Sequence, residues 1–300
     1  MGPDTKKALI IINSSAGIGK APADEQIIVD RFASQGYETR VFHIYSDADL
    51  ISDMKIPVDD APDIVISCGG DGTFNRTTNT ILKQSPQTVL AYVPFGNTDS
   101  FARSLGIPAG RDSALNTVFN GKLYKCDTGR LNDSYFNFVA SFAPASVMQY
   151  VTCQQMKGVF EYAKHILRAI GELNMNMGNG FDISIGSDKG TVEGSFIFGA
   201  VSNLSAIDGI NLSNDSFSNN DGIMELLMIK TPESRDEALE ALNVIREGSL
   251  DHPLISTSLI SNGSFVSGTD IAWSLDGEFG GIHKEAKLEV IRESLKVMTP

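Results

Sequence analysis

A short glycine-rich segment, Cys68-Gly69-Gly70-Asp71-Gly72-Thr73, has the residue types needed to bind a phosphate group. It follows an apolar run at residues 63–67 and precedes a segment that predicts a helix, so it lies where a parallel strand ends. Glycines allow backbone N–H groups to approach an anion closely, and a helix N-terminus favours negative charge. The segment therefore predicts a loop that binds a nucleotide phosphate. The alternative is a tight turn without a ligand.

Two acidic residues near the C-terminus could move a proton and hold a metal ion. Asp276 and Glu278 follow the strand-like residues 271–275, which contain the only tryptophan, Trp273. Alternate residues of an extended chain face the same side, so the two carboxylates are expected to point together. In phosphoryl transfer one carboxylate can accept a hydroxyl proton while another holds Mg²⁺. The alternative is a solvated Asp-Gly hairpin turn.

The first 120 residues are expected to form an α/β domain, because predicted strands and helices alternate along them. Nearly continuous apolar runs are typical of strands buried in a parallel sheet. The predicted strands are residues 8–12, 38–44, 63–67 and 88–93. The predicted helices are residues 24–34, 47–54, 75–83, 100–105 and 112–119.

The pattern changes after about residue 120, where short β-rich segments separated by Asn, Gly, Ser and Asp predict a mostly antiparallel domain. The predicted strands are residues 122–131, 135–141, 181–185, 195–202, 224–229, 253–259, 264–266 and 271–275. Helices are predicted at 156–173 and, after Thr231-Pro232, at 233–246. We therefore expect domains at residues 1–125 and 126–285, with residues 286–300 as a C-terminal segment that could return to the first domain.

The composition excludes several classes of protein. Of the 300 residues, 42% are hydrophobic and 20% are charged, as in globular rather than disordered chains. The net charge of −13 opposes binding to nucleic acid. Three cysteines without metal or disulfide spacing fit a reducing cytoplasm, and Cys68 is expected to be a buried strand residue rather than a reactive thiol. No apolar run approaches the roughly 20 residues that span a membrane.

Motifs spread in order along almost the whole chain resemble the bacterial diacylglycerol kinases and related lipid kinases. This family includes the sphingosine kinases and is distantly related to the NAD kinases. The matching positions are Asn13, Ser15 and Gly17 in a first turn, residues 69–73 with Asn75 in the phosphate loop, residues 94–103 followed by Leu-Gly-Ile-Pro at 105–108, the helix at 157–162, Asp221-Gly222, and Asp-Gly-Glu-x-Gly-Gly at 276–281.

This resemblance implies a first domain that binds the nucleotide, folded like NAD kinases and phosphofructokinases, and a β-rich second domain that binds the lipid. It implies ATP and Mg²⁺ as cofactors, with Glu278 or Asp276 as the base and with Asp71 and Glu278 holding the Mg²⁺ that arrives with ATP. The implied nucleotide contacts are Asn13, Ser14, Ser15, Ala16, Gly17, Gly69, Gly70, Asp71, Gly72, Thr73, Asn75, Asn97 and Thr98.

The resemblance also implies a structural Mg²⁺ in the second domain. The Asp221 carboxylate would bind it together with main-chain oxygens near Ser218 and Ile223, because Mg²⁺ prefers oxygen ligands. The alternative is an ordinary turn, since Asn, Asp and Ser side chains satisfy turn backbones by themselves.

Ser14 stands where the family usually has proline, and three departures cluster at the expected active cleft: Arg76 replaces a usual glutamate, Asn97 a threonine and Ser100 an aspartate. Thr98 and Asp99 could substitute in part after a small backbone shift, although geometry within about an ångström matters for rate. Altered substrate choice and lost activity therefore both remain open.

The sequence thus predicts an ATP-dependent lipid kinase that phosphorylates a hydroxyl of diacylglycerol or a related lipid. The alternatives are an NAD kinase-like enzyme and a catalytically impaired member that binds nucleotide or lipid. Residues 105–108 and 276–281 favour the lipid kinase. The expected partner is a lipid at the inner membrane surface, approached from the cytoplasm by a protein without a transmembrane segment or nucleic-acid partner. A homodimer is left open.

Overall fold

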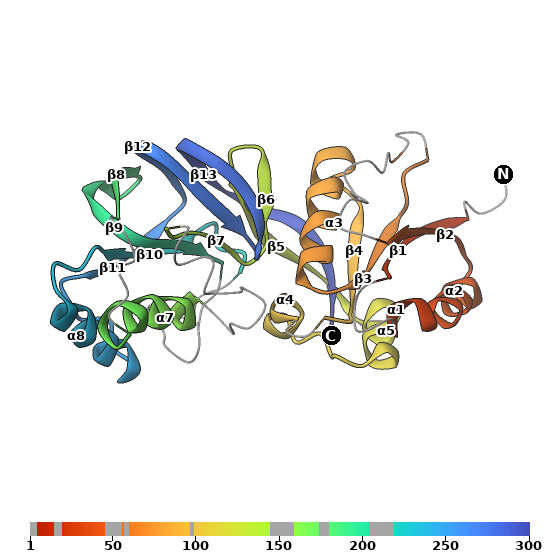
Figure 1. Ribbon diagram of the computed structural model, residues 1–300. Helices are drawn as coiled ribbons and strands as arrows, with labels where there is room; N and C mark the ends of the chain where they lie inside the picture. The colour runs from red at the N-terminus through yellow and green to blue at the C-terminus, as the bar shows by residue number, and fades with distance from the viewer. Residues whose placement is uncertain are drawn as a thin grey trace. The chain divides into compact units, whose positions relative to one another are not determined.

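The computed structural model describes residues 5–14, 20–45, 56, 60–96, 99–144, 159–173, 180–203 and 219–300 (Figure 1). Contacts between Cα atoms divide the chain into two compact units. The first consists of Met1–Cys126 and Glu293–Pro300, and the second of Asp127–Arg292. Two strands, β5 (Lys122–Leu131) and β13 (Glu278–Thr299), have residues in both units.

The first unit is built on a parallel sheet. Its strands are β1 (Lys6–Asn13), β2 (Tyr37–Ile44), β3 (Ile64–Gly69) and β4 (Val89–Pro94), arranged in the order β2-β1-β3-β4. All three neighbouring pairs are parallel, and the end of β13 adds a parallel contact to β4 through Val297 and Leu90. Every residue of β3 is buried, as its continuous apolar run predicts.

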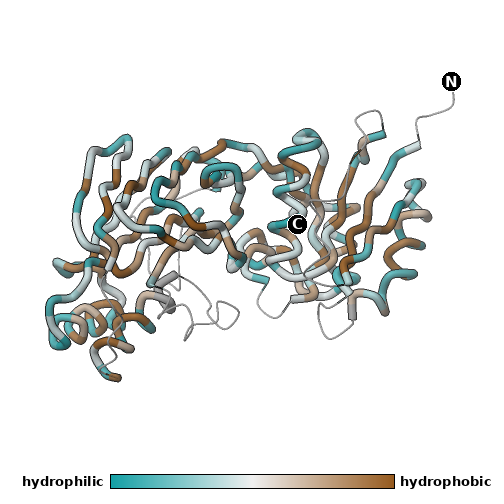
Figure 2. The backbone as a smooth tube through the Cα atoms, turned by 45° about the horizontal axis from the view of Figure 1, so that its top comes forward, coloured by the Kyte–Doolittle hydropathy of each residue, from teal (hydrophilic) through white to brown (hydrophobic). Residues whose placement is uncertain are grey.

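Helices cover both faces of this sheet. Residues of α2 (Glu25–Ser34) and α5 (Arg111–Asn120) share one hydrophobic core with β1, β3 and β4, next to the short α1 (Lys20–Ala23). Residues of α3 (Asp71–Gln84) and α4 (Ser100–Ser104) share the core on the other face. Apolar segments accordingly run along the strands, while polar and apolar residues alternate along the helices (Figure 2).

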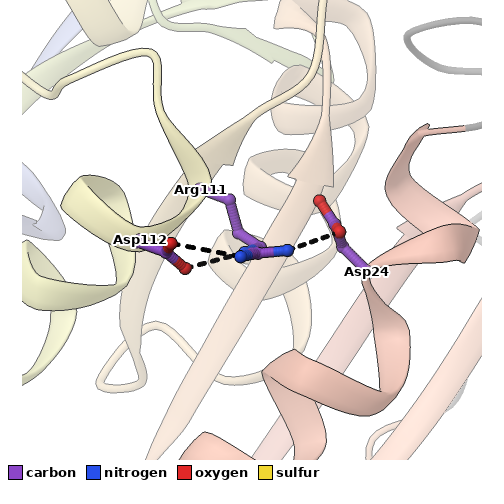
Figure 3. A network of polar contacts seen from close by, with 3 residues as sticks. All are labelled: Asp24, Arg111 and Asp112. Atoms are coloured by element: carbon purple, nitrogen blue, oxygen red, sulfur yellow. Dashed lines mark hydrogen bonds and ion pairs between the residues drawn. The ribbon is translucent and has the colours of Figure 1, made fainter.

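An arginine joins the N-termini of two helices on the first of these faces (Figure 3). Arg111 Nη1 donates to Asp24 Oδ1 at 2.6 Å, while its Nε and Nη2 donate to the two oxygens of Asp112 at 2.8 and 3.1 Å. Asp24 is the N-cap residue of α2, and Asp112 lies in the first turn of α5. Each carboxylate lies at a helix N-terminus, where the helix dipole favours negative charge, and the guanidinium compensates the charges of both.

The second unit is an antiparallel sheet in which β9 and β12 each pair with more than two strands. Its order is β11-β10-β9-β7-β12-β13, while β8 pairs with both β9 and β12, and β6 pairs with β5. The strands not yet given are β6 (Ser134–Phe136), β7 (Val139–Phe142), β8 (Phe181–Ser187), β9 (Gly190–Ser202), β10 (Met224–Lys230), β11 (Ile255–Ile260) and β12 (Asn262–Leu275).

Two hydrophobic cores stabilise this sheet. One lies under the helices α7 (Val159–Gly171) and α8 (Arg235–Arg246), which pack on residues of β9 and β10. The other is enclosed by the strands and contains Trp273, whose ring makes edge contacts with Phe142 and Phe265. The α8 N-terminus is capped because Ser234 Oγ accepts a hydrogen bond from the Glu237 N–H at 3.1 Å.

Some element bounds differ from the predictions. The predicted strand at 135–141 is interrupted between β6 and β7, where the backbone turns at residues 137–138. The predicted strands 264–266 and 271–275 are one strand, β12, because the polar residues between them form a register shift rather than a turn. Residues 286–298 continue β13 from Glu278. The predicted helix 47–54 lies outside the described residues.

Candidate active site

The strand order of the first unit creates a place for a ligand at the ends of β1 and β3. The chain leaves β1 for its neighbour β2 on one side and then returns to β3 on the other side. The helices that follow β1 and β3 therefore pack on opposite faces of the sheet, and they diverge at the carboxyl ends of these strands. Open α/β sheets bind ligands at such switch points. Asn13 ends β1 here, and Gly69 ends β3.

The two strand ends are joined by a hydrogen bond between predicted site residues. Asn13 Nδ2 donates to Thr73 Oγ1 at 2.8 Å. A Cβ atom on Gly69 would lie 2.5 Å from Thr73 Oγ1 and 2.6 Å from Thr73 Cβ. Gly69 is therefore required by the packing of Thr73 against the strand end, a role that the phosphate-loop prediction did not include.

The loops after β3 and β4 approach each other through two glycines. A Cβ on Gly70 would meet Gly96 Cα at 3.3 Å, and a Cβ on Gly96 would meet Gly70 Cα at 2.7 Å. Gly70 is the N-cap residue of α3 and gives this 14-residue helix no side-chain cap. The first N–H groups of α3, which include those of Gly72 and Thr73, therefore suit an anion.

Gly70→Ala is expected to weaken ATP binding about tenfold, because the new methyl group presses on Gly96 and stands at the uncapped end of α3. Isothermal titration calorimetry measures the change. Gly110→Ala is the control, since its Cβ would meet only Ser113 Oγ, at 3.8 Å. Equal ATP affinity in a folded Gly70→Ala protein and the wild type would show that the phosphate does not approach this glycine.

Asp71, predicted to be catalytic, is the first residue of α3 and binds the N-terminus of α4. Its Oδ2 accepts the Ser100 N–H at 2.8 Å, and its Oδ1 accepts the Phe101 N–H at 3.2 Å. Burial raises the pKa of this carboxyl, while the two N–H groups act in the opposite direction by stabilising its charge. Asp71 thus has a structural role in addition to any role at the nucleotide.

The structure describes only some of the remaining residues that are predicted to contact the nucleotide. The Ser14 N–H donates to the Ile44 carbonyl at 2.8 Å, and Asn75 is buried and receives two hydrogen bonds from Asn79 Nδ2. Ser15, Ala16, Gly17, Asn97 and Thr98 lie outside the described residues. Asp99, suggested as a substitute for the missing aspartate, is buried, and its Oδ1 accepts two internal hydrogen bonds.

In the second unit, the predicted alignment of Asp276 and Glu278 on an extended strand is wrong. Asp276 and Gly277 have φ of 52° and 88° and form a two-residue turn between Leu275 and Glu278. Asp276 Oδ2 accepts the Asn137 N–H at 2.7 Å, and Oδ1 accepts the N–H groups of residues 138 and 139 at 2.8 Å each. Asp-Gly favours this turn because both residues tolerate positive φ.

Glu278 is placed differently from Asp276. It is the first residue of β13, where it pairs with Leu275 across the turn, and it is half-buried. The next residue, Phe279, is 75% exposed. The turn that Asp276 stabilises therefore sets the position at which β13 begins. Asp276 lies within this turn, whereas Glu278 follows it in the strand.

The predicted metal residues lie in a polar corner of the second unit. Asp221 Oδ1 accepts the Ile223 N–H at 3.1 Å, and the Gly222 N–H donates to Asp127 Oδ2 at 2.6 Å. Ser218 lies outside the described residues. Asp127 is fully buried, and its carbonyl accepts a hydrogen bond from Asn203 Nδ2 at 2.8 Å. Sequence analysis did not select Asp127 or Asn203.

Glu225 in β10 is a further acid that sequence analysis missed. Its side chain is buried with 2% exposure, and neither carboxyl oxygen has a hydrogen-bond partner among the described residues. Burial and then the charge of Asp221 raise its pKa to about 8. A single acid inside the apolar run Met224–Lys230 was the signal that could have revealed it.

Glu225→Gln is expected to remove a loss of stability that the wild type shows as the pH rises from about 5 to about 8. The folded-state pKa of about 8 exceeds the ordinary 4.5, so the native state binds more protons and unfolding becomes easier as the pH rises. The loss amounts to roughly 1 kcal/mol per pH unit between about pH 5 and 8 in the wild type, levels off above the folded-state pKa and is absent with Gln. Urea unfolding in EDTA measures it, with Glu240→Gln on α8 as the control. Equal pH slopes in wild type and Glu225→Gln would contradict the assignment.

Three further observations concern Cys68, metal-binding groups and membrane-spanning helices. Cys68 is fully buried at the end of β3, and burial raises the pKa of its thiol, so it is the inert strand residue that was predicted. Within the described ranges, no group of three or more His, Cys, Asp or Glu side chains is arranged to hold a metal ion. The same ranges contain no helix that is long and apolar enough to span a membrane.

Comparisons with known proteins agree with the motifs. Residues 7–131 match the diacylglycerol kinase catalytic domain. The chain is 23% identical over 297 residues to a diacylglycerol kinase of Staphylococcus epidermidis, covering 98% of this chain and 92% of that protein. It is 25% identical over 280 residues to one of Bacillus subtilis, covering 92% and 91%.

The fold is also shared with solved structures. A diacylglycerol kinase from Bacillus anthracis superposes with a TM-score of 0.73 at 18% identity, covering 99% of this chain and 97% of that one. That likeness concerns the fold, whereas the match at residues 7–131 includes the phosphate loop and its strand. Residues 7–131 therefore match the diacylglycerol kinase catalytic domain, and the chain resembles the bacterial diacylglycerol kinases over nearly its whole length.

Proposed function

We propose that this protein is an ATP-dependent lipid kinase that transfers a phosphoryl group to a hydroxyl of diacylglycerol or a related lipid. The uncapped N-terminus of α3 carries the proposal, because it lies at the switch point of the parallel sheet within the matched catalytic domain. Relatives named diacylglycerol kinase align with more than nine-tenths of this chain and support the same chemistry.

In this proposal each unit has its own ligand. Residues 1–125, with a fold like those of NAD kinases and phosphofructokinases, bind ATP through the loops after β1, β3 and β4, including the undescribed residues 15–17 and 97–98. Residues 126–285 bind the lipid, which the protein meets at the membrane surface. Glu278 accepts the proton of the lipid hydroxyl, and Asp276 supports it by holding the turn at the start of β13.

The corner around Asp221 has the chemistry that suits Mg²⁺. The carboxylate of Asp221, the carbonyl of Ile223 and the chain near Ser218 are the proposed ligands, and they offer only oxygen atoms. Two carboxyls nearby support the proposal: Asp221 raises the pKa of Glu225, and the oxygens of Glu225 are buried without partners in the described residues. A cation bound at this corner would offset the repulsion between the carboxylates of Asp221 and Glu225. The Mg²⁺ that accompanies ATP would neutralise phosphate charge, with Asp71 as its proposed ligand.

Mg²⁺ is expected to raise the melting temperature of the wild type and not that of Asp221→Ala, because a ligand that binds only the folded state stabilises it. Thermal unfolding at increasing MgCl₂ without nucleotide measures this. Asp182→Ala, which removes an exposed acid of β8, is the control. If Asp221→Ala responds to Mg²⁺ like the wild type, Asp221 is not the cation ligand.

Transfer of radiolabel from [γ-³²P]ATP to lipid tests the proposed function. The purified protein is mixed with phosphatidylglycerol vesicles that contain diacylglycerol, and the lipid product is identified by chromatography. Labelled phosphatidic acid formed by the wild type and not by Glu278→Gln supports the proposal. Absence of label both in these vesicles and in a mixed lipid extract, from protein that still binds ATP, would overturn it in favour of a nucleotide-binding member without turnover.

A further inference from the structure

Tyr92 places a hydroxyl group inside the core of the first unit, directly behind the loop that follows β4. The side chain is 1% exposed, and its ring stacks on Phe74 of α3 with centroids 4.6 Å apart. Phe74 in turn stacks on Phe101 of α4 at 4.9 Å. Phe74 thus lies between the other two rings, and its stacking on the buried Tyr92 ring gives the Tyr92 hydroxyl a defined position. That hydroxyl donates to Asp99 Oδ1 at 3.0 Å.

Asp99 connects this buried tyrosine to the backbone of the loop. The same Oδ1 accepts the Gly96 N–H at 3.0 Å, and Asp99 has φ of 46° and ψ of 48°, a left-handed conformation that is unfavourable for most residues. The side-chain hydrogen bonds therefore hold a backbone conformation that the loop would not readily keep without them.

The conformation of Asp99 determines where the next two N–H groups point. Ser100 and Phe101 follow it directly, and their N–H groups donate to Asp71 at 2.8 and 3.2 Å. The backbone at the start of α4 thus links the hydrogen bond between Tyr92 and Asp99 to the two hydrogen bonds that Asp71 accepts. Both oxygens of Asp71 are held in this way.

The arrangement has an electrostatic disadvantage that hydrogen bonds must offset. Burial raises the pKa of Asp99, and the nearby charge of Asp71 raises it further, so the two carboxyls repel each other. Burial and the charges of both acids raise the pKa of Tyr92, so its hydroxyl stays a proton donor. The hydrogen-bond donors around Asp71 and Asp99 offset this repulsion, so the two carboxyls can lie close together although they are partly removed from water.

We propose that Tyr92 and Asp99 are positioning residues, which hold the Asp71 carboxylate in the orientation needed to bind the cation of Mg²⁺-ATP. This inference rests on the proposed function, since it gives Asp71 that task. Tyr92 and Asp99 touch neither substrate nor cation in this account. Their effect passes through the N–H groups of Ser100 and Phe101, and the Tyr92 hydroxyl also lowers the pKa of Asp71 directly by hydrogen bonding.

Tyr92→Phe tests the inference, because it removes one hydroxyl and keeps the stacked ring. Amide hydrogen exchange of the peptide that contains Ser100 and Phe101 is expected to accelerate about tenfold or more, without a comparable change in the other β4 and α3 peptides. The Kd for ATP measured by calorimetry is expected to rise about tenfold in Mg²⁺ and to stay within about twofold in EDTA.

Three further variants separate positioning from general loss of structure. Tyr124→Phe removes a hydroxyl from a tyrosine packed on the same core and is expected to match the wild type in both measurements. Asp99→Asn keeps an oxygen that accepts both hydrogen bonds and is expected to stay within about twofold of the wild type, whereas Asp99→Ala is expected to behave like Tyr92→Phe.

Unchanged exchange at Ser100 and Phe101 in Tyr92→Phe would overturn the inference, and so would an equal loss of ATP affinity in Mg²⁺ and EDTA. A wild type that binds no ATP at all would contradict the proposed function. The exchange measurement would still decide whether Tyr92 holds the Asp71 contacts.

Discussion

Glu278→Gln is expected to lower kcat about 100-fold or more while KM for ATP stays within about twofold. A lipid hydroxyl is a weak nucleophile whose proton must be accepted as it attacks, and Gln keeps the shape of Glu but cannot accept that proton. Glu278 starts β13 next to a turn whose geometry depends on Asp276 and Gly277 rather than on Glu278 itself. The substitution should therefore leave the melting temperature unchanged.

Initial rates at saturating diacylglycerol and varied ATP measure this effect. Glu285→Gln is the matched control, because it makes the same change at an exposed position of the same strand, opposite Val266. Near-full turnover in Glu278→Gln would exclude Glu278 as the base. If Glu278→Gln and Glu285→Gln lower kcat equally, the loss results from removing a negative charge from β13 and not from removing a base.

Asp276→Ala is expected to destabilise the second unit by about 3 kcal/mol or more. The change removes the acceptor of three partly buried backbone N–H groups, at residues 137, 138 and 139, and each of these donors left unpaired costs about 1 kcal/mol or more. Alanine is also less favourable than aspartate at φ of 52°, by about 1 kcal/mol. Any loss of turnover should follow from this loss of structure.

Urea unfolding followed by Trp273 fluorescence measures the loss, since this residue is close to the turn in β12. Asp276→Asn keeps one acceptor oxygen and tolerates positive φ, so it should lose less stability than Asp276→Ala. Asp133→Ala, an exposed residue of the turn between β5 and β6, is the control and should stay within about 0.5 kcal/mol of the wild type. A fully stable Asp276→Ala with low turnover would instead favour the catalytic role predicted from the sequence.

Much of the first unit could be predicted because its signals are local. A buried strand, a glycine turn and a helix start follow one another between residues 63 and 84, and each depends on neighbours a few positions away. The position of Asp71 at the start of α3 follows from that order. Its contacts with Ser100 and Phe101 do not, because they depend on how the loops after β3 and β4 approach through Gly70 and Gly96.

In the second unit the sequence indicated the strands but not the roles of the acids. The pair Asp276-Gly277 favours a hairpin turn. The prediction that Asp276 and Glu278 face the same side assumed instead that the chain is extended through these residues. The burial of Glu225 results from the pairing of β10 with β9 and β11, which are distant in the sequence from one another.

The prediction of a phosphate loop, the change from α/β to β-rich structure and the resemblance to lipid kinases all follow from the sequence alone, because propensity and motif spacing are properties of short segments. Which carboxylates accept hydrogen bonds from backbone N–H groups depends on the tertiary structure. Asp276 accepts the N–H of Asn137, 139 positions away, and Asp71 accepts the N–H of Ser100, 29 positions away. Such contacts depend on sheet register and loop approach, and these are set by packing of distant segments.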